Sequence, residues 1–387
     1  MRFFEFKQLN EEILLEAYTV GDIAETIWGA AMTAAFEKYP SPATVADTNR
    51  VLGSLDSKQA YQSPPRPDGE DSSLSDKISF INLIGYKQHI ADLKNWNQTK
   101  DRKPIPEVME LCTADANKRV KQEVLDLKDI FANGRADTIV IGAQGGADQK
   151  GTKIDVAITH TAEGVRNVTN LGYSLKTNLA NQKFMPAGQH TVVKKSRGGG
   201  RGLVDFFADF GVVKGIEEAS YEAYVKINDA LKRQHSGEKL EKFVDRKNNE
   251  IKDTFNRNLQ VAVNQINSKV DTEGEEVKLI DDISKFLDIH INKGESGVKL
   301  LTIEKKGVSV ASLEKFKENV DKFEISAEHL EDQDSMIIYA NKDPLFKIRF
   351  AVSGGQGSSN DPSEYRQLRY KIYIETGPGY KIYGAED

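Results

Sequence analysis

The chain has 387 residues, of which 39% are hydrophobic and 29% charged, and its formal net charge is −6. This length is enough for more than one domain, and the balance of apolar and charged residues excludes a wholly disordered chain. A single cysteine, Cys112, excludes an internal disulfide and a cysteine-based zinc cluster, which fits a reducing compartment.

The sequence shows neither a secretory signal nor a membrane-spanning helix. The opening MRFFEFKQLNEE lacks the apolar segment of a secretory signal. The most conspicuous apolar stretch, TIWGAAMTAAF (26–36), is about half as long as a membrane-spanning helix. We therefore expect a cytoplasmic protein, in a bacterial or phage-infected cell, that does not associate with a membrane.

The first 86 residues predict helices, a long loop and a strand, in that order. Apolar residues recur at helical spacing over 12–38, and Pro40 and Pro42 end the pattern. Residues 41–75 are rich in Ser, Pro, Asp and Gly, a composition that predicts a long loop. The apolar run 77–86 predicts a strand.

A helix and three strands are expected next. Residues 115–134 have one apolar helical face and end at Asn133-Gly134, which is typical of a helix stop. Three short apolar runs follow, separated by Gly-rich or polar turns, and predict neighbouring strands: 137–143, 153–159 and 170–177.

The remainder of the chain divides into a helical part and a mixed part. Residues 204–270 have a helical pattern, and a mixed α+β pattern begins after 271. Strands are expected at 297–304, 345–352 and 368–376, with a helix at 312–323. We accordingly divide the chain into a first domain, 1–235, and a helical connection with a smaller α+β C-terminal domain, 236–387.

Basic residues are concentrated in one segment. Between Gly164 and Val204 there is no acidic residue, although the overall composition predicts about six. The same segment holds seven basic residues: Arg166, Lys176, Lys183, Lys194, Lys195, Arg197 and Arg201. A block of one sign is typical of a surface that binds a polyanion, and a solvated loop without a partner is the alternative.

Two charged residues lie in apolar segments that we otherwise expect to be buried in a hydrophobic core. Asp155 lies in KIDVAITH (153–160), and Lys176 lies near the end of LGYSLKT (171–177). An unpaired buried charge costs several kcal/mol, so the two residues either pair with each other or face a metal ion. Alternation along a strand places Ser174 and Lys176 on the same face.

Asp155 in one apolar strand and Ser174-Leu175-Lys176 in the next resemble the core of the PD-(D/E)XK nuclease superfamily, over roughly residues 12–235. The resemblance implies an α+β fold with a restriction-endonuclease-like mixed sheet flanked by helices. It also implies that the aspartate binds a divalent metal and that the lysine positions or activates the attacking water. The opening MRFFEFK and the segment GDIAETIWGAAMTAAF also resemble bacteriophage-encoded proteins of this superfamily.

Ser174 departs from that pattern, because the superfamily usually has a second acidic metal ligand at this position. Some members supply the acid from the first helix instead, and Glu25 is our candidate. It shares an otherwise apolar helical stripe with Trp28, where burying a carboxylate that has no function would cost free energy. A partly exposed helix acid is the alternative. Gln182, six residues after Lys176, matches a glutamine that some members carry.

The resemblance assigns Asp155 and Glu25 as ligands of Mg²⁺, or of Mn²⁺ in its place. Carboxylate oxygens suit such ions, and the ammonium of Lys176 would stabilise developing negative charge. Cations outside the metal site would contact DNA: Lys183, Lys194, Lys195, Arg197 and Arg201.

The implied function is a metal-dependent DNA endonuclease, with a site-specific restriction enzyme as one form and a homodimer as one assembly. In that form residues 275–387 would read bases. The alternatives are a non-catalytic phage DNA-binding or structural protein that keeps the fold, and an RNA-binding module that uses KKSRGGGRG (194–202). Motifs of P-loop ATPases, zinc peptidases and serine hydrolases are absent from the sequence.

Overall fold

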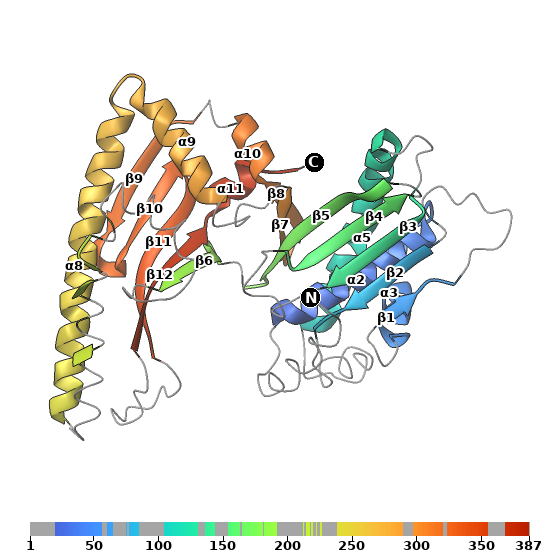
Figure 1. Ribbon diagram of the computed structural model, residues 1–387, viewed down its shortest axis with the longest axis horizontal. Coiled ribbons are helices and arrows are strands. Elements are labelled where there is room, and N and C mark those ends of the chain that lie inside the picture. Colours follow the sequence, from blue (N-terminus) through green and yellow to red (C-terminus); the bar gives the residue numbers. More distant parts are fainter. Residues whose placement is uncertain are drawn as a thin grey trace. The chain divides into compact units, whose positions relative to one another are not determined.

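The computed structural model describes residues 20–55, 60–64, 75, 77–84, 104–130, 136–143, 154–162, 165–180, 182–191, 238–288, 297–319, 323–354 and 368–386, with scattered positions between 212 and 226. Within these residues the chain forms two sheets, one mixed and one antiparallel, each with its own helices (Figure 1). The predicted α+β class, with a mixed sheet and helices packed against it, is confirmed.

The first compact unit comprises Met1–Gln182 and Glu295–Ser312. Its mixed sheet has the strand order β1-β2-β3-β4-β5-β7-β8, in which β2–β3 and β5–β7 are parallel and the other pairs antiparallel. The strands are β1 (Ala60–Gln62), β2 (Lys77–Asn82), β3 (Thr138–Ala143), β4 (Val156–Ala162), β5 (Val165–Asn178), β7 (Val298–Glu304) and β8 (Gly307–Ser312).

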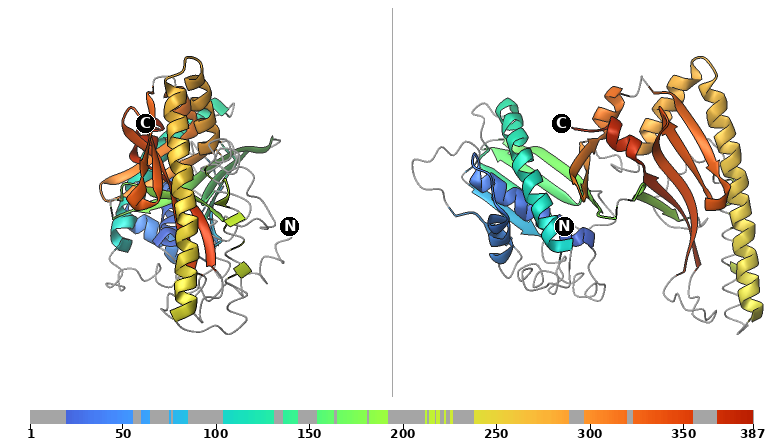
Figure 2. Two further views of the ribbon diagram at one scale, coloured as in Figure 1. Left: turned by 90° about the vertical axis from the view of Figure 1, so that its left-hand side faces the viewer. Right: turned by 180° about the vertical axis from the view of Figure 1, so that it is seen from behind.

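Three helices belong to this unit: α2 (Val20–Lys38), α3 (Val45–Gly53) and α5 (Pro104–Ile130). Helices α2 and α5 pack against each other on one face of the sheet (Figure 2). From Ile23 to Phe36 every side of α2 is buried, which explains its nearly uniform apolar composition. At Gly29 the helix comes so close to β2 that an added Cβ would lie 2.5 Å from the Phe80 ring.

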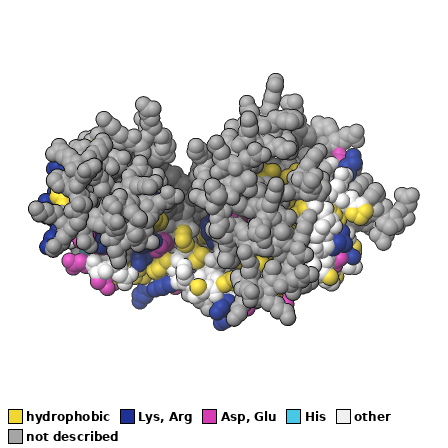
Figure 3. Space-filling model, turned by 90° about the horizontal axis from the view of Figure 1, so that it is seen from below, with side chains coloured by type: hydrophobic (Ala, Val, Ile, Leu, Met, Phe, Trp, Pro, Cys, Tyr) yellow, Lys and Arg dark blue, Asp and Glu magenta, His cyan; other side chains and the backbone are white. Residues whose placement is uncertain are grey.

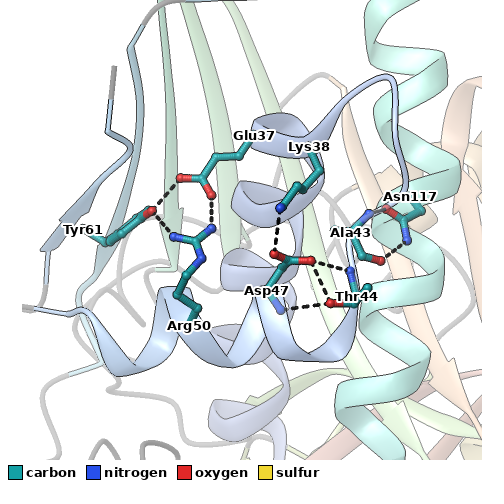
Figure 4. A network of polar contacts seen from close by, with 8 residues as sticks. All are labelled: Glu37, Lys38, Ala43, Thr44, Asp47, Arg50, Tyr61 and Asn117. Atoms are coloured by element: carbon teal, nitrogen blue, oxygen red, sulfur yellow. Dashed lines mark hydrogen bonds and ion pairs between the residues drawn. The ribbon is translucent and has the colours of Figure 1, made fainter. Parts of the chain in front are cut away.

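The loop predicted for residues 41–75 is wrong over part of its length, because α3 and β1 lie within it. Helix α3 begins with a capping box, in which the Asp47 amide donates to Thr44 Oγ1 at 3.2 Å and the Thr44 amide donates to the Asp47 carboxylate at 2.9 Å. The Nζ atom of Lys38 lies 3.2 Å from the same carboxylate (Figure 4). Polar capping stabilises a short helix that its apolar residues alone would not predict.

A second set of polar contacts ties α3 to α2 and to β1. Arg50 donates to Glu37 and, at 2.6 Å, to the hydroxyl of Tyr61 (Figure 4). That hydroxyl in turn donates to Glu37 at 2.7 Å. The short strand β1 is thereby fixed to the end of α2.

The second compact unit comprises Lys183–Gly294 and Leu313–Asp387. Its antiparallel sheet has the order β6-β12-β11-β10-β9. The strands are β6 (Met185–Thr191), β9 (Ile325–Leu330), β10 (Ser335–Ala340), β11 (Asp343–Gly354) and β12 (Leu368–Thr376). The helices are α8 (Glu238–Val270), α9 (Glu275–Leu287), α10 (Leu313–Asn319) and α11 (Pro378–Tyr383), with a short 3₁₀ turn at Glu331–Gln333.

Helices α8 and α9 lie along one face of this second sheet (Figure 1). The ring of Phe255 on α8 is 5.2 Å from that of Phe350 on β11, and Phe286 on α9 is 4.8 Å from Phe346. All four side chains are buried, so this unit has a hydrophobic core of its own.

The two units do not divide the chain at the expected boundary near residue 235. Strand β7 pairs with β5 in parallel, from Gly172 opposite Val298 to Asn178 opposite Glu304, so 297–312 belong to the first unit. Strand β6 pairs with β12 and belongs to the second. Parallel neighbours require a long crossover, and here the whole of 183–294 intervenes. Such a distant partner leaves no local signal in the sequence.

Most of the other predicted elements are present. The strands expected at 77–86, 137–143, 153–159, 170–177, 297–304, 345–352 and 368–376 correspond to β2, β3, β4, β5, β7, β11 and β12. Helix α5 begins at Pro104, well before the expected residue 115. Among the residues that the structure describes, none of the helices is both long and apolar enough to cross a membrane.

Candidate active site

Asp155 lies directly before β4 and is bonded to β5 through both its backbone and its side chain. The Asp155 backbone amide donates to the carbonyl of Tyr173 at 2.8 Å. The Oδ2 atom accepts hydrogen bonds from the Leu175 amide at 2.6 Å, Ser174 Oγ at 3.2 Å and Lys176 Nζ at 3.3 Å. The structure thus brings together the three residues that the sequence singled out on neighbouring strands.

Part of this cluster remains open to solvent. The side chain of Lys176 is 29% exposed and that of Asp155 is 21% exposed. All the hydrogen bonds that Asp155 accepts from described residues end on Oδ2, and none of them ends on Oδ1. The pairing of Lys176 with Asp155 agrees with the first interpretation, in which the two charges pair with each other, and the exposure of both side chains is compatible with the second, in which they face a metal ion.

Glu25 of α2 is the third acidic candidate, and its environment is unusual. The residue is only 7% exposed, and its Oε2 atom has no hydrogen-bond partner among the described residues. Burial, together with the negative charges of Asp155 and Asp22, raises the pKa of Glu25 to about 9, although Lys176 acts in the opposite direction. The carboxyl is therefore neutral at pH 7 in the free protein, and it lies within the electrostatic field of the Asp155–Lys176 pair.

The other two site residues expected from the sequence, Ser174 and Gln182, have different places in the structure. Ser174 is 4% exposed and donates to Asp155, so it orients that carboxylate. Gln182 is exposed, and its backbone amide and carbonyl bond to the side chain of Asn178 at 2.6 and 2.9 Å. Asn178 closes the turn after β5 in this way. In the described residues no hydrogen bond joins the Gln182 side chain to the acidic cluster.

Asp137, which precedes β3, does not belong to this cluster. Strands β3 and β4 are antiparallel, with Thr138 opposite Thr161 and Ala143 opposite Val156. Asp137 therefore lies at the opposite end of the sheet from Asp155.

Only one of the residues expected to contact DNA phosphates lies in the described part of the chain. Lys183 is exposed and belongs to the second unit. Lys194, Lys195, Arg197 and Arg201 lie outside the described residues. On the face shown in Figure 3, the basic and acidic side chains that are drawn in colour are interspersed rather than separated.

A buried polar network that the sequence analysis missed lies behind the cluster. Trp28 Nε1 donates to the Asp115 carboxylate at 2.8 Å, and Arg119 binds both oxygens of the same carboxylate at 2.8 and 3.0 Å. Trp28 lies on α2, three residues after Glu25, whereas Asp115 and Arg119 lie on α5. The network thus fixes the helix that carries Glu25.

The same network extends to the strands. The Tyr173 ring lies 4.8 Å from that of Trp28, and its hydroxyl donates to Glu123 at 3.2 Å. His160 Nε2 on β4 lies 3.9 Å from the other oxygen of Glu123. The spacing of Asp115, Arg119 and Glu123, four residues apart along one helix, is the signal that could have revealed this polar stripe.

The acidic residues of the cluster could supply part of the coordination of a hard divalent cation. Within the described ranges no three His, Cys, Asp or Glu side chains form a ready-made metal site. Glu25 Oε2, however, is buried and has no hydrogen-bond partner among the described residues, and the hydrogen bonds that Asp155 accepts from described residues all end on Oδ2. An ion that binds through one or two carboxylates and keeps several waters, as Mg²⁺ does, fits this set.

Comparisons with known proteins add no identification. No protein-family model, no curated protein and no solved structure matches this chain.

Proposed function

We propose that the first unit is a metal-dependent DNA endonuclease that hydrolyses phosphodiester bonds at Glu25, Asp155 and Lys176. One observation carries the proposal: the buried carboxyl of Glu25, whose Oε2 atom has no hydrogen-bond partner among the described residues, interacts electrostatically with an Asp–Lys pair on two neighbouring strands. A purely structural ion pair has no need of a third, buried acid, which is costly to keep. A phosphate-cleaving site needs two oxygen ligands and a cation in this arrangement.

Each residue has a distinct role in this proposal. Glu25 and Asp155 would hold Mg²⁺ or Mn²⁺, which when bound polarises the scissile phosphate and lowers the pKa of a coordinated water. Glu25 must lose its proton to serve as a ligand, because its pKa is about 9 in the free protein. Ser174 and the Leu175 amide hold Oδ2 of Asp155 in place. The Lys176 ammonium stabilises negative charge that develops on the phosphate.

DNA is the favoured substrate on two grounds. The residues of the cluster resemble those of a nuclease superfamily, and the acid-free segment from Gly164 to Val204 includes β5 and continues beyond it. A cationic segment that follows Lys176 in the sequence would neutralise phosphates of the DNA backbone.

A second candidate function is a non-catalytic DNA-binding or structural protein. Ser174 favours it, because the serine donates a hydrogen bond where a metal ligand would be expected. Lys176 already has a partner in Asp155, so the pair can also exist without a substrate.

Closed circular plasmid, linear duplex and single-stranded DNA should be incubated with the full chain in Mg²⁺, Mn²⁺ or EDTA. We expect nicking or linearisation of the plasmid with either metal and none in EDTA, because a closed circle offers no ends to an exonuclease. Lys176→Ala should cleave at least a hundredfold more slowly than the wild type. Cleavage that persists in EDTA, or that remains within tenfold of the wild-type rate in the variant, would refute the proposed site, and binding without any cleavage would favour the second function.

A further inference from the structure

In the second unit, one face of the sheet carries cations on alternating positions. On β11 the buried residues Phe346, Ile348 and Phe350 point toward the core formed with α8 and α9. Successive side chains alternate between the two faces of a strand, so Lys347 and Arg349 point to the opposite face. Arg349 lies opposite Tyr373 on β12, which places that ring on the same face.

The Tyr373 ring has two cations beside it. The guanidinium carbon of Arg349 lies 4.4 Å from the ring centroid, and Nζ of Lys371 lies 5.9 Å from it. Arg349 Nε also donates to Glu375 at 2.7 Å, which holds the guanidinium in position. The Arg349 side chain remains 35% exposed and Tyr373 is half-buried, so part of this stack is accessible.

A second ring repeats the arrangement. Phe184, just before β6, has Nζ of Lys183 and Nζ of Lys347 each 5.6 Å from its centroid. Lys347 belongs to the same face as Arg349, so the two ring clusters share one surface. We call it the aromatic–basic face, and it comprises Lys183, Phe184, Lys347, Arg349, Lys371 and Tyr373.

This combination fits an extended polyanion with flat, unstacked bases. Cation–ring pairs occur about once per 70–80 residues in proteins, whereas four are gathered on this face. Aromatic rings and guanidinium planes stack on nucleobases, and ammonium groups neutralise phosphates. The bases of a duplex are stacked on one another and offer no free surface to such rings, so the ligand must be single-stranded.

We propose that the aromatic–basic face binds single-stranded DNA. Bases would stack on Phe184 and on the Arg349–Tyr373 pair, while Lys183, Lys347 and Lys371 contact phosphates. The choice of DNA over RNA rests on the proposed function, whereas the choice of a single strand rests on the rings. Such a face would select unpaired regions of a substrate.

The test is the affinity of the full chain for a fluorescent oligo(dT) of about 20 nucleotides, long enough to cover one binding face. Binding is measured by anisotropy in EDTA, so that cleavage cannot interfere. We expect Tyr373→Leu and Phe184→Leu each to weaken binding about tenfold, because leucine keeps apolar bulk but cannot stack. Arg349→Lys should weaken it as well, since the charge remains and the planar group is removed.

Tyr339→Leu is the matched control. Tyr339 lies on the same sheet and donates to Glu328 at 2.7 Å, and in the described part of the chain no cation lies beside its ring. Its substitution should leave the affinity unchanged. Thermal unfolding of each variant shows that the sheet is intact.

Three results would overturn the inference: unchanged affinity in both ring variants, an equal loss in Tyr339→Leu, or tighter binding of a duplex or of the corresponding RNA. A protein that never cleaves DNA but loses affinity in the ring variants would refute the proposed function alone. Cleavage that persists while the ring variants bind normally would refute only this inference.

Discussion

Lys176 Nζ lies 3.3 Å from Oδ2 of Asp155, and the two side chains are 29% and 21% exposed. An ion pair in such contact with water contributes at most about 1 kcal/mol to folding. Stability alone is therefore a weak reason for this pair to lie beside the buried carboxyl of Glu25. The contrast between a small effect on folding and a large effect on chemistry gives the first prediction.

Lys176→Ala should lower plasmid cleavage at least a hundredfold, but change the free energy of unfolding by no more than about 1 kcal/mol. Cleavage rates and urea unfolding measure the two quantities on the same preparation. Lys38→Ala, which removes an ion pair with Asp47 in the same unit, should leave cleavage unchanged. A Lys176→Ala variant that cleaves within tenfold of the wild type would show that the site is misassigned.

The second prediction separates the proposed metal ligand from its hydrogen-bonding neighbour. Glu25→Gln should weaken Mg²⁺ binding and reduce cleavage at least a hundredfold, because it removes one of two carboxylates. Ser174→Ala should have a much smaller effect, because Asp155 keeps its bonds to the Leu175 amide and Lys176. Calorimetric titration with Mg²⁺ measures both affinities, and the opposite order would exclude Glu25 as a ligand.

The raised pKa of Glu25 gives a stability prediction with a definite sign. The pKa is about 9 in the folded protein, compared with an ordinary value of 4.5. Between these values the folded state binds the proton more tightly, so the stabilisation is complete below about pH 4.5 and is lost as the pH rises toward 9. Glu25→Gln cannot titrate, so its melting temperature should rise relative to that of the wild type across this range.

Melting curves of wild type, Glu25→Gln and Ser174→Ala at intervals from pH 5 to 9 check this prediction. Ser174→Ala keeps the titrating carboxyl and should follow the wild type. If Glu25→Gln and the wild type differ by the same amount at every pH, the carboxyl is ionised in the folded protein and lies in a different environment.

The local part of the site could be predicted, because it depends on short-range geometry. Alternation along β5 places Ser174 and Lys176 on one face, and the apolar stripe of α2 makes Glu25 conspicuous. The partners of the strands could not be predicted in the same way. Strand β7 pairs with β5 although residues 183–294, which belong to the other unit, separate the two strands in the chain, and no residue near β5 indicates that pairing.

Elements stabilised by polar contacts also escaped prediction. Helix α3 has only nine residues, too few to show a clear helical periodicity, and polar contacts stabilise it, namely the capping box of Thr44 and Asp47 and the Arg50–Tyr61 hydrogen bond. The network around Asp115 and Glu123 escaped for a related reason. Helical spacing shows which residues share a face, but it does not show whether a polar face is solvated or buried against Trp28 and Tyr173.

The close approach of α2 to the sheet gives a fourth prediction, on packing. Gly29→Ala should destabilise the protein by about 1–3 kcal/mol, because the new methyl group would meet the fully buried Phe80 ring. Helix propensity alone predicts the opposite, a gain of about 1 kcal/mol. Gly53→Ala, where a Cβ meets no atom within 4 Å, is the control. Urea unfolding that shows a gain at Gly29 would contradict the observed packing of α2 on β2.

The last prediction tests the basic segment independently of the chemistry. Lys194, Lys195, Arg197 and Arg201 lie after β5, in the stretch without acidic residues. If all four bind phosphates, changing them to alanine should lower the affinity for every DNA sequence alike. The slope of log affinity against log salt should also flatten by about three to four units, roughly one for each phosphate that is no longer neutralised. Titrations in EDTA from low to moderate salt measure this slope.

A charge-matched control replaces four exposed lysines of the second unit by alanine and should leave the slope unchanged. These lysines are Lys278, Lys285, Lys315 and Lys317. Parallel slopes for the wild type and the first variant would mean that this segment is solvated and that DNA binds elsewhere.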